Sequence, residues 1–202
     1  MIGLKNVLIW ALLFCVSVFS AGCAKECGNN AIYPADISYE GHRMATKSSG
    51  HSFPHNSLES LKDLIASEVS TVEFDVRSTR DNELIIMHDS DTCSYGEKNV
   101  VISKTMLSEI PRMKGGFKVP TMQEVVGMLE GRRFATVLVD MKAAGSDSIK
   151  RFEDLVKDLI IDHDKVVILY DYSDRTLRKS MCDIAYRNGI EVQNYKFQVI
   201  CR

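Results

Sequence analysis

Residues 72–89 read VEFDVRSTRDNELIIMHD, and this stretch is the most informative part of the chain. Apolar and charged residues alternate through its first part, and this period of two is typical of a strand with two different faces. Glu73 and Asp75 are therefore expected to project from one face of that strand. A second short apolar run, 83–87, ends at His88. The stretch thus predicts two carboxylates and a histidine close to the ends of two strands.

Outside this stretch, strand patterns and helix patterns follow one another along the chain. Strands are expected at 36–41, 71–76, 83–87, 135–141, 165–170 and 190–192. Apolar residues at helical spacing predict helices within 56–65, 121–129, 149–160 and 177–188, and 90–119 is expected to be rich in loops. The expected caps are Asn56 with Glu59, Thr121 with Glu124, and Asn188-Gly189. Strands that alternate with helices predict an α/β fold with a parallel sheet.

The residues with the strongest chemistry lie at or just past the ends of the predicted strands. They are His42, Arg43, Glu73, Asp75, His88, Asp140 and Lys142. The carboxyl ends of the strands carry the active site in a (β/α) barrel. Carboxylate oxygens suit Ca²⁺ or Mg²⁺, two histidines can divide acid and base work, and basic side chains pair with phosphate. This combination predicts metal-assisted cleavage of a phosphodiester.

An ordered set of short motifs resembles the glycerophosphodiester phosphodiesterase family of TIM barrels. Any one of these motifs is weak evidence, but their common order and spacing from about Ser38 to Lys142 make the resemblance specific. The motifs are Gly41-His42-Arg43, Pro54-His55-Asn56-Ser57, Glu73-Phe74-Asp75, Thr79-x-Asp81, His88-Asp89, the run 119–124 (VPTMQE) and Asp140-Met141-Lys142.

The resemblance implies a fold, a reaction and a role for each residue. It implies a TIM-type barrel and the hydrolysis of glycerophosphodiesters to glycerol 3-phosphate and an alcohol. It implies a divalent metal, Ca²⁺ or Mg²⁺, a small-molecule substrate and no organic cofactor. The implied catalytic residues are His42 and His88, the phosphate-binding residues are Arg43 and Lys142, and the metal ligands are Glu73, Asp75 and Asp140. Which histidine is the acid and which the base stays open.

Three positions depart from the family pattern. Met44 stands where glycine usually follows His-Arg, and His55 stands where the Pro-Glu-Asn-Thr motif has its glutamate. Asp140 is one methylene shorter than the usual glutamate. These departures bear on the substrate entrance and on the metal site.

Each of these residues also has a simpler interpretation. The carboxylates can be solvated strand residues, the two histidines structural and Lys142 a surface lysine. His51, His55 and His163 are expected in loop, helix-cap and surface positions. Two other functions stay open. One is a related phospholipase D-like barrel enzyme that acts on lysophospholipid or sphingomyelin-type substrates, and the other is a non-catalytic relic.

The N-terminus predicts export. Lys5 precedes the apolar run 7–19, which small residues follow, so residues 1–22 are expected to be a signal peptide. Ala21-Gly22-Cys23 resembles the end of a bacterial lipobox, so Cys23 is the expected lipidation site of a lipoprotein in the membrane or periplasm. Free secretion and a single-pass anchor are the alternatives. A tether, 23–35, and one phosphodiesterase domain, 36–202, are expected to follow.

Length, charge and cysteines limit the remaining possibilities. The mature chain of 23–202 is shorter than the roughly 250 residues of a TIM barrel, so about five of eight βα units and a C-terminal truncation are expected. Open sheet edges then predict self-association. The net charge of −2 does not indicate a nucleic-acid partner. Cys27, Cys93, Cys182 and Cys201 allow three disulfide pairings or isolated thiols.

Overall fold

The computed structural model describes residues 41–46, 52–170, 174–194, 196 and 198–201. The expected signal peptide 1–22, the lipidated Cys23, the tether 23–35 and residues 36–40 of the first expected strand lie outside the described residues, as does His51. In the part of the chain that is described, no helix has the length and apolar character needed to cross a membrane.

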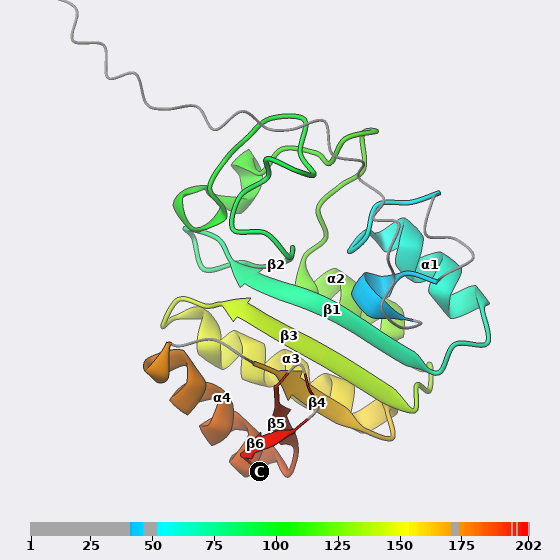
Figure 1. Cartoon of the computed structure of the whole chain (residues 1–202), viewed down its shortest axis with the longest axis vertical. Helices are drawn as coiled ribbons and strands as arrows, with labels where there is room; N and C mark the ends of the chain where they lie inside the picture. Colours follow the sequence, from blue (N-terminus) through cyan, green and yellow to red (C-terminus); the bar gives the residue numbers. More distant parts are fainter. Residues whose placement is uncertain (1–40, 47–51, 171–173, 195, 197, 202) are drawn as a thin grey trace, which may run out of the picture.

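The core of the protein is one six-stranded sheet with the order β2-β1-β3-β4-β5-β6 (Figure 1). Strands β1, β3, β4 and β5 run parallel, while β2 and β6 pair antiparallel with β1 and β5. Strand bounds are β1 Thr71–Ser78, β2 Leu84–Ile86, β3 Thr136–Ala143, β4 Val166–Leu169, β5 Glu191–Gln193 and β6 Val199–Cys201. The expected parallel sheet is confirmed for β1, β3, β4 and β5, both edge strands are antiparallel, and β6 was not predicted.

Connection length explains the antiparallel edge at β2. Only residues 79–83 separate β1 from β2. A parallel return needs a crossover of about a dozen residues or more, so this short turn forces a hairpin. The parallel strands, by contrast, are separated by segments that contain a helix.

Four α-helices pack against one face of this sheet in a single apolar core. They are α1 Leu58–Ala66, α2 Met122–Leu129, α3 Ser148–Asp162 and α4 Arg175–Asn188. Strand β1 faces them with Val72, Phe74 and Val76, which are fully buried. Three short 3-10 helices complete the described secondary structure: η1 His42–Met44, η2 Ile102–Lys104 and η3 Leu107–Glu109.

Two of the three predicted helix caps are confirmed. Thr121 accepts a hydrogen bond from the Glu124 amide and Glu124 bonds back, which is a capping box, and Gly189 ends α4 in the left-handed region. The prediction for α1 is wrong, because Ser57 and not Asn56 is its N-cap and accepts from the Ser60 amide at 3.1 Å. Asn56 is used elsewhere, as described below.

Residues 90–119 and the C-terminal strand are held by separate means. The loop-rich segment has a small core of its own around Ile85, Met87 and Met113. A disulfide joins Cys182 on α4 to Cys201 on β6, and Cys93 is also disulfide-bonded. The alternative of isolated thiols is therefore wrong for these three cysteines.

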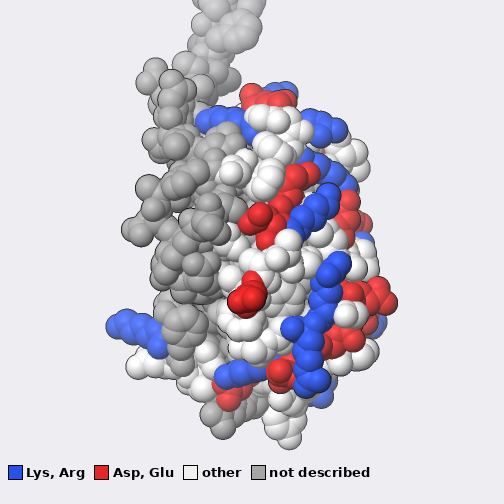
Figure 2. Space-filling view, turned by 90° about the vertical axis from the view of Figure 1, so that its right-hand side faces the viewer, with Lys and Arg blue, Asp and Glu red and all other residues white. Residues whose placement is uncertain are grey.

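The surface seen from the right-hand side of Figure 1 carries interspersed acidic and basic residues rather than a patch of one sign (Figure 2).

Candidate active site

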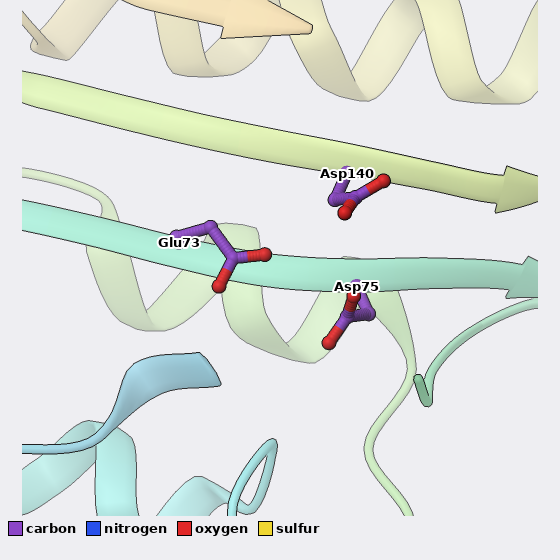
Figure 3. Close-up of side chains that lie close together, drawn as sticks. All are labelled: Glu73, Asp75 and Asp140. Atoms are coloured by element: carbon purple, nitrogen blue, oxygen red, sulfur yellow. The ribbon is translucent and has the colours of Figure 1, made fainter. Parts of the chain in front are cut away.

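Three carboxylates meet near the middle of the neighbouring strands β1 and β3. Glu73 and Asp75 come from β1, and Asp140 comes from β3, where it is the direct register partner of Asp75 (Figure 3). One oxygen of each lies within 4.8 Å of the others. Each residue is at most 2% exposed. The structure thus brings together all three predicted metal ligands, on the sheet face opposite the helices.

The electrostatics of this cluster favour a cation. Burial raises the pKa of Glu73 well above its ordinary value, and the like charges of Asp75 and Asp140 raise it further. Such a buried group of carboxylates is stable only with positive charge close by. Three carboxylate donors also match the oxygen preference of Ca²⁺ and Mg²⁺, so the residues present fit a hard divalent ion.

Lys142 supplies part of this positive charge. Its ammonium group lies 3.0 Å from Asp75 Oδ1 and 2.5 Å from Asp140 Oδ2, and its side chain is 4% exposed. The interpretation of Lys142 as a surface lysine is therefore wrong. The expected contact with phosphate stays a prediction, because in this structure the ammonium group bonds the metal-ligand candidates.

The Gly-His-Arg turn lies directly against β1. Gly41 adopts a φ of 86°, and a Cβ there would lie 2.0 Å from the Thr71 carbonyl oxygen, so this close approach requires glycine. The Arg43 amide donates to Glu73 Oε2 at 2.7 Å, and its Nε lies 3.6 Å from Asp75 Oδ2. Arg43 therefore braces two of the three carboxylates.

His42 lies on the same turn beside the carboxylates. Its Nε2 is 4.0 Å from Glu73 Oε2. Burial, and after it the neighbouring positive charge of Arg43, lowers the pKa of His42 to about 4. The His88 charge also contributes to lowering this pKa, so the two predicted histidines interact electrostatically. At neutral pH His42 is therefore an uncharged imidazole that can accept a proton.

His88 follows β2, and its ring is partly open to solvent. The Met87 amide donates to the Asp75 carbonyl at 3.0 Å, which fixes the chain next to the carboxylate cluster. His88 Nδ1 lies 2.7 Å from Asp89 Oδ1, and this hydrogen bond lowers the pKa of Asp89. A charged Asp89 holds the proton on Nδ1 and leaves Nε2 for proton transfer.

Two residues of the Pro-His-Asn-Ser segment belong to this site, although the sequence pattern predicted a helix cap there. Asn56 has a φ of 60°, and its side-chain amide donates to Asp75 Oδ2 at 2.8 Å. His55 is 1% exposed, its ring meets that of His42 edge-on at 6.4 Å, and burial lowers its pKa to about 4. The Pro-His-Asn-Ser motif itself was the sequence signal for a role in the site. A segment that only caps a helix does not need an Asn directly before the N-cap residue.

Three further residues differ from the expectation or were not expected. His163 is 8% exposed and accepts a hydrogen bond from the Phe134 amide at 3.2 Å, so the prediction of a surface position is wrong. Met44, at the usual glycine position, has a φ of 58° and a fully buried side chain. Tyr95 was not predicted, yet its hydroxyl accepts from Arg43 Nη1 at 3.3 Å.

Comparison with known proteins identifies the family. The sequence model of the glycerophosphoryl diester phosphodiesterase family matches residues 47–182. The chain belongs to this family. The match covers the three carboxylates, His88 and Lys142, whereas His42 and Arg43 lie before it.

Solved structures of this family share the fold. The match to a glycerophosphoryl diester phosphodiesterase from Parabacteroides distasonis covers 77% of this chain and 53% of that one, with 19% identity and a TM-score of 0.57. The match to a phosphodiesterase domain from Mycobacterium tuberculosis covers 76% and 57%, with 13% identity and a TM-score of 0.54. The match to a phosphodiesterase from Oleispira antarctica, in complex with sn-glycerol-3-phosphate, covers 70% of this chain and 59% of that one, with 18% identity and a TM-score of 0.52.

These likenesses confirm the predicted fold class. In the residues that the structure describes, the α/β sheet with its outer helices has the fold of part of a TIM-type barrel. The chain spans between half and three fifths of the length of these three structures.

Proposed function

We propose that this protein hydrolyses glycerophosphodiesters to glycerol 3-phosphate and an alcohol. The observation that carries the proposal is the buried trio of Glu73, Asp75 and Asp140, with His42 and Arg43 packed against it. Family membership supports the reaction class. The Oleispira structure, a complex with the product sn-glycerol-3-phosphate, supports the substrate class.

The three carboxylates are the proposed ligands of one divalent ion, Ca²⁺ or Mg²⁺. When bound, such an ion offsets the negative charge of the phosphodiester. The residues around the trio complete the charge balance. Arg43 and Lys142 already pair with Asp75 and Asp140, and we assign to both a second role as phosphate contacts.

His42 and His88 are the proposed acid and base. The neutral ring of His42 suits a proton acceptor, and the hydrogen bond from His88 Nδ1 to Asp89 leaves Nε2 of His88 for proton transfer. Both lie on short segments tied to β1, one by the Glu73–Arg43 contact and one by the Asp75–Met87 hydrogen bond. These ties hold the two rings in a defined relation to the carboxylates.

The test is glycerol 3-phosphate release from glycerophosphocholine. Turnover is expected to disappear in excess chelator and to return with Ca²⁺ or Mg²⁺, and Asp140→Asn is expected to bind the ion weakly. Asp154→Asn is the matched control, since Asp154 is an exposed aspartate that pairs only with surface lysines among the described contacts. Full turnover in chelator, with no metal retained, contradicts the proposal.

Choline release, compared among glycerophosphocholine, lysophosphatidylcholine and sphingomyelin, separates two reactions on one site. Faster choline release from the two lipids than from glycerophosphocholine assigns the protein to the phospholipase D-like class. No turnover on any of these substrates, with metal bound, assigns a non-catalytic role.

We also propose that the protein is exported and carries lipid on Cys23. The basic start, the short apolar run and the Ala21-Gly22-Cys23 exit support this. The protein is then expected in the detergent phase on phase partition, and Cys23→Ser is expected to release it. Wild-type protein wholly in the aqueous phase favours free secretion.

We further propose self-association through the outer strand β6. Among the described strands β6 pairs only with β5, and an unpaired strand edge can add a strand from another chain. The outer side of β2 is less open, because Ile86 donates to the Pro120 carbonyl and Ile85 forms a bridge with Thr121. Sedimentation velocity over a range of concentrations tests this. A single monomeric species at every concentration contradicts it.

A further inference from the structure

Arg77 lies on β1, two residues beyond Asp75 and on the same sheet face as Glu73 and Asp75. Its guanidinium group forms two hydrogen bonds to one acceptor. Nε donates to the His88 carbonyl oxygen at 2.9 Å, and Nη2 donates to the same oxygen at 2.7 Å. Strand β1, which carries Glu73 and Asp75, is therefore also hydrogen-bonded to the main chain of His88 through Arg77.

Main-chain hydrogen bonds hold the residues on both sides of His88, from Ile86 to Pro120 and from Ile102 to Ser90. Strand β2 ends at Ile86, and His88 follows in a bend. The Met87 amide is bonded to the Asp75 carbonyl at 3.0 Å, and the ring is bonded to Asp89, its own neighbour in sequence. The ring bond orients the imidazole but moves with the segment. Among the described hydrogen bonds, the two from Arg77 join the main chain of His88 itself to strand β1.

We propose that Arg77 is a positioning residue, which holds His88 in register with the carboxylate trio by gripping its carbonyl group. The proposal rests on the proposed function for the catalytic role of His88. A planar guanidinium provides two donors in a fixed fork, whereas a lysine ammonium is a point charge on a flexible stem. Loss of the fork lets the His88 segment move while the carboxylates stay in place. A displacement of about 1 Å of a catalytic group can lower turnover by about a hundredfold.

The first experiment compares Arg77→Ala and Arg77→Lys with wild-type protein on glycerophosphocholine. Both variants are expected to lose about tenfold to a hundredfold in kcat with little change in KM. Millimolar guanidinium chloride is expected to restore part of the kcat of Arg77→Ala, and sodium chloride at equal ionic strength is not. Arg80→Ala is the control, because Arg80 is an exposed arginine that pairs with Glu109.

Two outcomes overturn the positioning role. A rise in KM with unchanged kcat means that Arg77 binds substrate directly. A loss of kcat that Arg77→Lys fully restores means that only its charge matters. If Arg77→Ala does not fold, Arg77→Lys and Arg77→Gln are compared in the same way.

A second experiment reads the position of His88 without turnover. Diethylpyrocarbonate modifies accessible histidines, and peptide mass spectrometry reports each rate. Modification of His88 is expected to change severalfold in Arg77→Ala, to return toward the wild-type rate with guanidinium, and to be unchanged in Arg80→Ala. An unaltered rate in all variants contradicts the proposal. If wild-type protein has no turnover, the proposed function fails, and this measurement still decides the role of Arg77.

Discussion

The two faces of strand β1 are almost equally buried but have opposite effects on the folded state. Toward the helices, Val72, Phe74 and Val76 are removed from water and stabilise the fold. On the other face, Glu73 and Asp75 are just as inaccessible, and burial raises the pKa of Glu73 because its charged form is disfavoured there. Burial by itself therefore does not identify a core. Burial of the apolar face stabilises the folded state, whereas burial of the carboxylate face destabilises it and offsets part of that gain.

The largest effect is expected on the apolar face. Phe74→Ala removes a fully buried ring from the main core and is expected to lower the free energy of unfolding by roughly 3–5 kcal/mol. Urea unfolding measures this. A loss below about 1 kcal/mol would mean that the helix layer repacks freely and that the two faces do not differ as described.

A loss of comparable size is expected at Asp75, one residue further along the strand. Here transition-state stabilisation is lost, and the stability of the fold is not. Asp75→Asn keeps the side-chain shape but removes the charge that Lys142 and Arg43 share. Turnover is expected to fall by about a thousandfold, which is roughly 4 kcal/mol, while the free energy of unfolding changes by less than about 1 kcal/mol. Steady-state kinetics and urea unfolding on the same sample check both halves. A large stability loss with normal turnover would reverse the assignment of this face.

A smaller loss is expected at the histidines. His42→Ala and His88→Ala are each expected to lower turnover by about a hundredfold with the fold intact, as removal of an acid or base does. A substrate with a nitrophenolate leaving group needs no general acid, so the variant that lacks the acid is expected to recover on it. Near-wild-type turnover of either variant on glycerophosphocholine means that this histidine is structural.

The buried histidines also predict how stability depends on pH. Burial lowers the pKa of His55 from 6.5 to about 4 in the folded protein, so between these values the unfolded chain binds more protons. The contribution of a neutral His55 is therefore fully present above about pH 6.5 and is lost as the pH falls toward 4. Relative to His55→Gln, wild-type protein is expected to lose on the order of 1–2 kcal/mol between about pH 7 and pH 5, measured by urea unfolding. Parallel pH profiles for the two proteins would contradict a buried neutral imidazole.

The smallest effect concerns the cap of α1, which the sequence pattern misplaced. Ser57→Ala is expected to lower the free energy of unfolding by about 1 kcal/mol, because the Ser60 amide loses its acceptor. Asn56→Ala is the sharper comparison, because it is expected to lower turnover through its bond to Asp75. If Asn56→Ala changes only helix stability, Asn56 belongs to the cap after all.

Local patterns allowed much of this fold to be predicted. The alternation through Val72 to Val76, the Thr121–Glu124 capping box and the Asn188-Gly189 end act within a few residues, so the sequence alone carries their signal. The family motifs are also short stretches of sequence, and they predicted that the carboxylates and histidines share one site. What was missed depends on distant partners. Strand β6 forms against β5 and is linked to α4 by the Cys182–Cys201 disulfide, and three pairings of the cysteines were open.

The order of strands and helices from α1 to β5, the family and the residue types at the site therefore follow from the amino-acid sequence alone. How these residues share charge depends on the tertiary structure. The parallel register that sets Asp75 beside Asp140 also places the Lys142 ammonium between them, and the left-handed turn at Asn56 directs its amide to Asp75 instead of to the helix. The physical reason is range. Periodicity and capping act along the chain, whereas electrostatic balance in a buried site depends on which strands become neighbours.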